Sequence, residues 1–391
     1  MPKIVYLDTL PAQNGLDILH DQKKVDVIKI NSSDSEEKCF SILRTADAYQ
    51  VGAARDEVPK YLQVDKEFLK NLLTDDVIEK INAVGDSRIT SLKNLKAVNP
   101  NMRTIYIKPP AKEYAEDLVK YADISLNSSF NTIEAINEAA KKMDKIHEII
   151  IMVELGELRE GVQRADIMNF YEKVFKLSNI EVVGIGSNLG CMYGVEPSYD
   201  KLLQLALYKE LISAKFNKKL KYISGGTSIT LTLIEMGTLP KEINHFRIGE
   251  AAFFGLSPLD NKQFNGLHTD TFEFSANIIE LEEKKIVPEG IISDANIGHT
   301  AEFDEENINE TSVKAILDFG LLDVAKEDIE AQDSSLSFVG ITSDMLVVDL
   351  DKNRTNEGKR KYKVGDEILF TLNYMGVARL LSSKFIGKRF E

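Results

Sequence analysis

The sequence predicts an α/β protein: a (β/α)8 barrel of the TIM type followed by a C-terminal antiparallel β domain. Up to about residue 270, short apolar runs alternate with helical patterns, which favours parallel strands. The number of alternating units favours a barrel over an open sheet. From about residue 271, strand-like segments follow one another without helices, which favours an antiparallel sheet. We therefore divide the chain into residues 1–73, 74–270 and 271–391.

The first part, residues 1–73, has a β-α-β-α-β pattern that predicts parallel strands. A helix is expected over residues 12–21. An acidic and hydroxyl-rich stretch at residues 32–37 is a helix-start signal, and the helix that follows should run to about residue 44. The predicted strands are Lys3–Leu7, Val25–Ile30 and Ala48–Gly52.

A charged, helical stretch is expected at residues 56–80, across the boundary between the first part and the barrel part. The run Ile149–Val153 is continuously apolar, as expected for a strand buried on both faces. The other strands predicted for the barrel are 81–84, 104–107, 124–126, 182–185, 222–223 and 246–248. Helical patterns separate them. In the C-terminal part, the predicted strands are 272–279, 346–350 and 367–372.

Composition argues against several classes of partner. The 391 residues carry a formal net charge of -14, which disfavours nucleic acid and anionic membranes as partners. The two cysteines, Cys39 and Cys191, and the five histidines lack the spacing of a disulfide framework or a metal site. There is no signal-like N-terminus and no long apolar span. We therefore expect a cytoplasmic protein that does not enter the membrane.

Two glycine-containing stretches stand out, Ile223–Ser228 and Asn244–Ala251. Each contains or follows a predicted buried strand, and each is expected to turn through glycine and small hydroxyl residues. Glycines let backbone N–H groups approach an anion closely, and Ser and Thr add hydroxyl donors. Two such turns in neighbouring βα units would form a phosphate-binding cup at one end of a barrel. A plain tight turn is the alternative for either stretch alone.

Besides the two glycine-containing stretches, the chain from about residue 83 onward contains the motifs Gly85–Ile89, Tyr121–Ser128, Met152–Gly161, Gly184–Leu189 and Leu372–Tyr374. Through these motifs it resembles the ornithine racemase branch of the alanine-racemase-like enzymes, which are pyridoxal phosphate proteins with a barrel and a β domain. The motifs occur in order and are specific as a set. The resemblance implies a pyridoxal phosphate cofactor, a small amino acid such as ornithine as substrate, racemisation by α-proton exchange, and a homodimer.

The resemblance also implies roles for individual residues. Arg247 would face the pyridine nitrogen and keep it unprotonated, while Arg159 and Asn188 would lie near the cofactor ring. Without the resemblance, Arg159 also fits a salt bridge on a helix face and Asn188 a turn. The phosphate would be held by Ser224, Gly225, Gly226, Thr227, Gly249, Glu250 and, from the β domain, Tyr374. Tyr374 also fits the core of its own domain.

The catalytic lysine is the point at which this sequence departs from the family. The family uses a lysine at the end of the first barrel strand, whose amine forms a Schiff base and acts as an acid/base. Lys29 is our candidate, because it lies late in the strand Val25–Ile30, in a segment similar to the lysine strand of alanine racemases. Lys60 is a second candidate, although the adjacent Pro59 disfavours a central strand. The third alternative is a non-catalytic barrel that has lost its lysine.

Residues 1–73 also resemble the N-terminal segment of D-2-hydroxyacid dehydrogenases, through Leu7–Leu10 and Ala46–Pro59. The nucleotide-binding GxGxxG motif of those enzymes is absent, which disfavours hydride transfer as the activity.

The second acid/base of alanine racemases is a tyrosine from the β domain of the partner subunit. The comparable segment here, Asp318–Val324, has leucine where a polar group is needed. His299 and Asp344 are the polar residues that we consider as substitutes.

Overall fold

The computed structural model describes residues 83–391, except 265, 294–297, 301, 303–309, 356, 384, 390 and 391. Before residue 83 it describes three short strands and residue 38, which is helical. Otherwise, the helices predicted at 12–21, 32–44 and 56–80 lie outside the described residues. Contacts divide the chain into two compact units, the first reaching Thr269 and the second beginning at Asp270. Each unit is described by itself.

The N-terminal strands form a small parallel sheet in the order β2-β1-β3, which confirms the parallel strands predicted there. Their bounds are Lys3–Leu7 for β1, Asp26–Ile30 for β2 and Ala48–Tyr49 for β3. Along the edge strand β2, Lys29 is opposite Tyr6 of β1.

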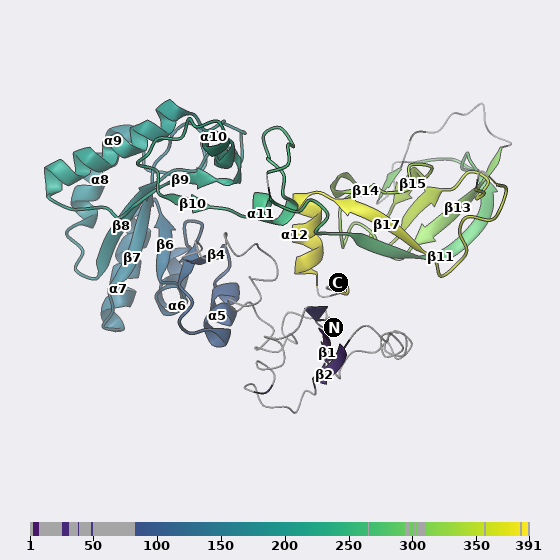
Figure 1. Ribbon diagram of the computed structural model, residues 1–391, viewed down its shortest axis with the longest axis horizontal. Helices are drawn as coiled ribbons and strands as arrows, with labels where there is room; N and C mark the ends of the chain where they lie inside the picture. The colour runs from purple at the N-terminus through teal and green to yellow at the C-terminus, as the bar shows by residue number, and fades with distance from the viewer. Residues whose placement is uncertain are drawn as a thin grey trace. The chain divides into compact units, whose positions relative to one another are not determined.

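The barrel sheet contains seven parallel strands in the order β10-β9-β8-β7-β6-β5-β4 (Figure 1). Each strand therefore pairs with the next strand along the chain, as in a singly wound barrel. The strands are β4 Val84–Asp86, β5 Thr104–Tyr106, β6 Ile124–Asn127, β7 His147–Met152, β8 Ile180–Gly186, β9 Tyr222–Thr227 and β10 His245–Arg247. The sheet is nearly closed, with β4 and β10 at its two edges.

Strand β7 shows why the apolar run at its centre is continuous. Ile149 and Ile151 pack on one face, in the core that the helices cover, whereas Ile150 and Met152 pack on the other face inside the barrel. All four side chains are completely buried. A strand buried on both faces needs apolar residues at every position rather than at alternate positions, so the prediction of a buried strand is confirmed.

The helices of this unit follow the strands and cover the outer face of the sheet; α9, for example, packs on β8 and β9. Helix α9 begins after Ser198, whose hydroxyl accepts from the N–H of Lys201, and ends at Asn217 in the left-handed conformation. The helices are α5 Ile89–Val98, α6 Ala115–Tyr121, α7 Phe130–Lys142, α8 Ile167–Val174, α9 Tyr199–Phe216, α10 Leu231–Glu235 and α11 Glu250–Phe254. Single 3-10 turns are Lys112–Tyr114, Arg164–Asp166 and Ser228–Thr230.

One local prediction is wrong: the chain does not turn at Ser224. Strand β9 continues through Gly225 and Gly226 to Thr227, paired with β8 and β10. Glycine suits these two positions of the strand, because neighbouring side chains occupy the space that a β-carbon would need. A β-carbon on Gly226 would lie 1.9 Å from the ring of Phe246, and one on Gly225 would lie 2.7 Å from Leu202.

The second unit is built on a seven-stranded antiparallel sheet in the order β12-β15-β16-β13-β11-β17-β14. Alternate residues Phe274, Ala276 and Ile278 of the long strand β11 are buried, which is the period of a half-exposed strand. The elements are β11 Phe274–Lys285, β12 His299–Thr300, β13 Thr311–Leu317, β14 Ile329–Ala331, β15 Ser337–Ile341, β16 Leu346–Asp349, β17 Glu367–Leu372, α12 Tyr374–Ser382 and the 3-10 turn Lys326–Asp328.

The predicted fold class, a TIM-like barrel followed by an antiparallel β domain, is therefore confirmed. Among the described strands, β1–β3 do not pair with the barrel edges β4 and β10. Of the helices in the described ranges, none has the length and apolar composition needed to cross a membrane.

Prediction for the strand β9: Gly226→Ala should lower the free energy of unfolding by about 1–3 kcal/mol, because the added methyl group overlaps the Phe246 ring. Gly249→Ala is the matched control, since a β-carbon there meets no heavy atom within 4 Å. Urea titration followed by circular dichroism measures both. Equal stability of the two variants would contradict the packing role assigned to Gly226.

Candidate active site

The C-terminal ends of β8, β9 and β10 meet around the side chain of Arg247. Its Nη2 donates to the backbone oxygen of Ser187 at 2.8 Å and to Asn188 Oδ1 at 3.3 Å. Its Nη1 donates to the backbone oxygen of Ser224 at 3.2 Å and to the Ser224 hydroxyl. From the end of β10, the guanidinium therefore contacts the end of β8 and the middle of β9, and it brings Asn188, Ser224 and Arg247 together.

Burial lowers the pKa of Arg247 from 12.5 to about 10. The carboxylate of Glu160 acts in the opposite direction, and the positive charge of Arg159 lowers the pKa further. Since the lowered pKa still lies well above neutrality, Arg247 remains a charged hydrogen-bond donor at physiological pH. A second cation and an acid thus lie close enough to Arg247 to influence its charge.

Arg159 lies in the loop after β7, where its side chain bridges two partners. Its Nε is 2.5 Å from Glu160 Oε2, and its Nη1 is 2.6 Å from the sulfur of Cys191, in the loop after β8. The side chain of Glu160 is only 9% exposed. Sequence reasoning missed Glu160, because an acid next to an arginine in a charged loop has the same local pattern as a surface ion pair.

The hydroxyl of Ser228 joins the two glycine-containing stretches. Ser228 Oγ accepts the backbone N–H of Gly249 at 3.3 Å and that of Ala251 at 3.1 Å. The turn at Ser228 is fixed by a reciprocal pair of bonds between Thr227 and Thr230. A β-carbon on Gly249 would meet open space. The beginnings of the 3-10 turn Ser228–Thr230 and of α11 are therefore held beside each other.

The predicted phosphate-binding residues divide into two groups in this structure. Ser224 is completely buried, with its hydroxyl in contact with Arg247 and His245, and Gly225 and Gly226 have packing roles in β9. Thr227, Gly249 and Glu250 lie at the turns after β9 and β10. Burial raises the pKa of Glu250 above its ordinary value.

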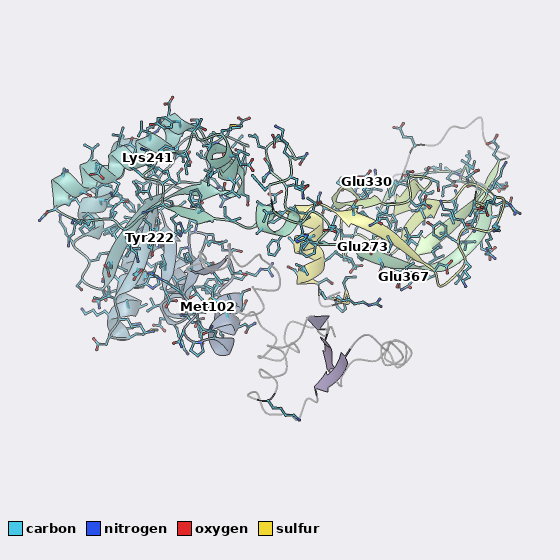
Figure 2. The ribbon with its side chains drawn as sticks, in the orientation of Figure 1. Met102, Tyr222, Lys241, Glu273, Glu330 and Glu367 are labelled. Atoms are coloured by element: carbon cyan, nitrogen blue, oxygen red, sulfur yellow. The ribbon has the colours of Figure 1, made fainter. Side chains whose placement is uncertain are left out.

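A chain of polar side chains also runs along the barrel strands toward Arg247. His245 Nδ1 lies 2.8 Å from Ser224 Oγ, and the His245 ring lies 5.3 Å from the ring of Tyr222 (labelled in Figure 2). The hydroxyl of Tyr222 accepts from Arg103 at 3.1 Å, and Arg103 forms an ion pair with Glu148. The sequence offered no signal for His245, because its contacts come from residues 21 and more positions away.

The remaining candidates are not placed at this site. Lys29 lies in β2 of the separate N-terminal sheet, and Lys60 lies outside the described residues. Tyr374 is the first residue of α12 in the second unit and is 44% exposed, and His299 and Asp344 are exposed in that same unit. None of the seven barrel strands contains a lysine.

Comparison with known proteins identifies the family of the chain. The profile of the family described as the N-terminal domain of alanine racemase matches residues 73–258. An ornithine racemase of Acetoanaerobium sticklandii is 36% identical over 319 residues, which covers 80% of this chain and 88% of that protein. The chain belongs to this racemase family. A lysine racemase of Thermotoga maritima is 29% identical over 312 residues, covering 80% of this chain and 84% of that protein.

Solved structures show the same fold. Alanine racemase of Clostridium difficile 630 superposes with a TM-score of 0.55 at 16% identity, covering 79% of this chain and 80% of that chain. Alanine racemase of Corynebacterium glutamicum gives a TM-score of 0.54 at 15% identity, covering 75% and 76%. A D-threonine aldolase of Filomicrobium marinum gives 0.52 at 12% identity, covering 75% and 73%. At such identities the likeness establishes the fold alone.

Members of this racemase family are pyridoxal phosphate enzymes, and the residues around Arg247 fit that cofactor in two respects. The Nδ2 of Asn188 is buried and has no hydrogen-bond partner among the described residues, so a donor is available where the strands end. The open space at Gly249 lies beside the paired turns that would hold a phosphate. The lysine that the family uses is the part of the site that the seven described barrel strands do not supply.

Prediction for pH dependence: burial lowers the pKa values of His147 and His245 from 6.5 to about 4. Between these values the unfolded chain binds more protons than the folded chain, so the free energy of unfolding should rise with pH. The stabilisation should be complete above pH 6.5 and should be lost as the pH falls toward 4. Urea titrations at several pH values measure this slope.

The double variant His147→Asn/His245→Asn should have a flatter pH profile in this window. The control is His299→Gln, which changes an exposed side chain and should keep the wild-type slope. A double variant with an unchanged slope would show that other groups cause the pH dependence.

Proposed function

We propose that this protein is a pyridoxal phosphate-dependent amino-acid racemase of the ornithine racemase type. Its substrate would be a small basic amino acid whose L and D forms are interconverted by exchange of the α-proton. The observation that carries the proposal is the Arg247 guanidinium, charged and held across the ends of β8, β9 and β10. The 36% identity to an ornithine racemase supports the substrate class.

Arg247 would bind the ring nitrogen of the cofactor through one particular N–H group. Arginine has five N–H donors, and the Nη1 and Nη2 groups already have four acceptors in Ser187, Asn188 and Ser224. This leaves the Nε–H for the ring nitrogen. Because Arg247 keeps its proton at neutral pH, it would act as a donor there and leave the ring nitrogen unprotonated. When bound, pyridoxal phosphate supplies the electron sink that acidifies the α C–H bond of the substrate.

The other roles follow from the positions of the side chains. Asn188 and Arg159 would lie along the ring, where the Asn188 Nδ2 has no partner among the described residues. The phosphate would be held by the turns that Ser228 ties together, where the predicted residues Thr227, Gly249 and Glu250 lie. The predicted residues Ser224, Gly225 and Gly226 would support these turns from within β9. Tyr374 is proposed as a further phosphate ligand, contributed by the β domain of a homodimer.

The racemase proposal needs a lysine, and Lys29 remains our candidate for it. Its amine would bind the cofactor covalently and hold the proton that leaves Cα. In this structure Lys29 is part of β2, whose backbone pairs with β1, so the proposal requires β2 to reach the barrel. The three-part division of the chain into residues 1–73, 74–270 and 271–391, the homodimer and the cytoplasmic location are proposed with it.

A second function is favoured by one observation: within the described part of the barrel, residues 83 onward, none of the seven strands contains a lysine. In this alternative the barrel binds pyridoxal phosphate through its phosphate and ring contacts alone. Without the amine, no group is placed to take the α-proton, and the protein would not racemise amino acids.

Prediction for the lysine: wild-type protein incubated with pyridoxal phosphate and reduced with borohydride should carry a covalent label on Lys29, and Lys29→Ala should lose both the label and ornithine racemisation. Peptide mapping locates the label, and chiral chromatography measures the racemisation. The control is Lys241→Ala, at an exposed position, which should leave both unchanged. A label on Lys60 would keep the activity but reject Lys29, and a complete lack of label would favour the second function.

Prediction for the phosphate site: Gly249→Ala should weaken pyridoxal phosphate binding by about tenfold, the cost of a lost hydrogen bond, because its methyl group would enter the space beside the Ser228 turn. Stability should not change. Gly387→Ala is the control, since its β-carbon also meets nothing within 4 Å but lies in the second unit. Fluorescence titration with the cofactor measures both, and equal affinities would reject this location for the phosphate.

A further inference from the structure

We propose that Glu157 is a positioning residue that clamps the loop after β8 to the loop after β7, and so places Asn188 and Arg159 for the cofactor. The inference rests on the proposed function for its cofactor part. It concerns a side chain to which neither the sequence motifs nor the site around Arg247 assigned a role.

The carboxylate of Glu157 is 1% exposed and accepts four backbone N–H groups from a single loop. Oε1 accepts from Cys191 at 3.0 Å and from Tyr193 at 2.7 Å. Oε2 accepts from Gly190 at 3.1 Å and from Val195 at 3.1 Å. Two acceptor positions on each carboxylate oxygen are thus used, and every donor lies 33 to 38 residues away in the sequence.

The backbone on both sides is shaped for this contact. Gly156 and Leu158, which flank Glu157, have positive φ values of 117° and 54°, and the Leu158 side chain is 65% exposed. A leucine in the left-handed region costs about 1–2 kcal/mol, and such strain persists only where the surroundings hold it. On the other loop, Gly190 and Gly194 have φ values of 69° and 68°. With these conformations, the N–H groups of that loop point toward the Glu157 carboxylate.

A buried carboxylate is costly unless hydrogen bonds replace its water. Burial by itself would raise the pKa of Glu157, but the N–H groups of Tyr193, Cys191, Val195 and Gly190 hold it below its ordinary value. The charged form is therefore the one that the loop stabilises. In return, the charge orders four N–H groups, one of which, that of Gly190, also donates to the backbone oxygen of Val195 at 2.8 Å.

The clamped loop carries two contacts to the candidate site. Asn188, at its start, accepts from Arg247, and Cys191 contacts the Arg159 guanidinium at 2.6 Å. Arg159 follows Glu157 by two residues, so the same clamp fixes both ends of the Arg159–Cys191 contact. If the loop were released, the Asn188 amide and the Arg159 guanidinium would no longer be held in place at the candidate site.

The neighbouring acid, Glu154, does not join the two loops as Glu157 does. The Glu154 carboxylate bonds the N–H groups of Gly156 and Arg159 within its own loop. It thus shapes the β7 loop, whereas Glu157 joins that loop to the next. A carboxylate elsewhere, Asp328, is 8% exposed and pairs with Arg379 in the second unit. It offers a control for the general effect of removing a buried charge.

Prediction for the clamp: Glu157→Gln keeps the shape but turns an acceptor into an N–H donor that faces the N–H groups of the loop. Hydrogen exchange of residues 189–195 in the cofactor-free protein should become about tenfold faster or more. The affinity for pyridoxal phosphate should fall about tenfold, with a shift in the absorbance maximum of the bound cofactor. Glu157→Asp, which keeps the charge on a shorter side chain, should restore part of each effect.

The control Asp328→Asn should change neither the exchange of residues 189–195 nor the cofactor spectrum. Faster exchange with an unchanged affinity and spectrum would show that Glu157 is only structural and would overturn the positioning role. Unchanged exchange would overturn the clamp itself. If the wild-type protein bound no pyridoxal phosphate, the proposed function and the cofactor part of this inference would both fail, whereas the exchange rates would still decide the clamp.

Discussion

A charged guanidinium enclosed by strand ends is the constraint on which the candidate site depends. Arg247 keeps its charge at neutral pH although burial lowers its pKa to about 10, and a buried charge must be compensated by hydrogen bonds. The acceptors come from Ser187, Asn188 and Ser224. The ends of β8 and β9 must therefore stay in register with β10, and parallel pairing along the chain provides that register.

The barrel could be predicted from local patterns, but its contacts could not. The apolar run of β7 predicted a buried strand because both of its faces are covered, and that information lies within a few residues. The end of β9 was misjudged because glycine usually indicates a turn, whereas Gly226 is in contact with the Phe246 ring 20 positions away. Arg247 and Asn188 were proposed through family motifs, and the structure brings the two side chains into contact. Glu157 and His245 were missed, because their partners are distant in the sequence.

The described barrel supplies several groups of the candidate site, whereas the candidate lysine, Lys29, lies in the N-terminal part of the chain. The family profile matches residues 73–258, and β1–β3 form their own parallel sheet. The barrel provides a charged donor, a buried amide and paired turns at its C-terminal end. A D-threonine aldolase has a similar fold, which illustrates that one barrel can support different reactions. A single side chain, the lysine, would bind the cofactor covalently, and the barrel fold by itself does not specify which residue that is.

The contact between Gly226 and Phe246 constrains which substitutions can occur at these two positions during evolution. A β-carbon at residue 226 would overlap the ring at residue 246, so residue 226 cannot gain a side chain while the ring is present. A side chain can be acquired at residue 226 only after residue 246 has become smaller. An aromatic ring can return at residue 246 only after residue 226 is glycine again. Relatives should therefore not combine a side chain at residue 226 with a ring at residue 246, and this rule helps to align β9 with β10 in distant sequences.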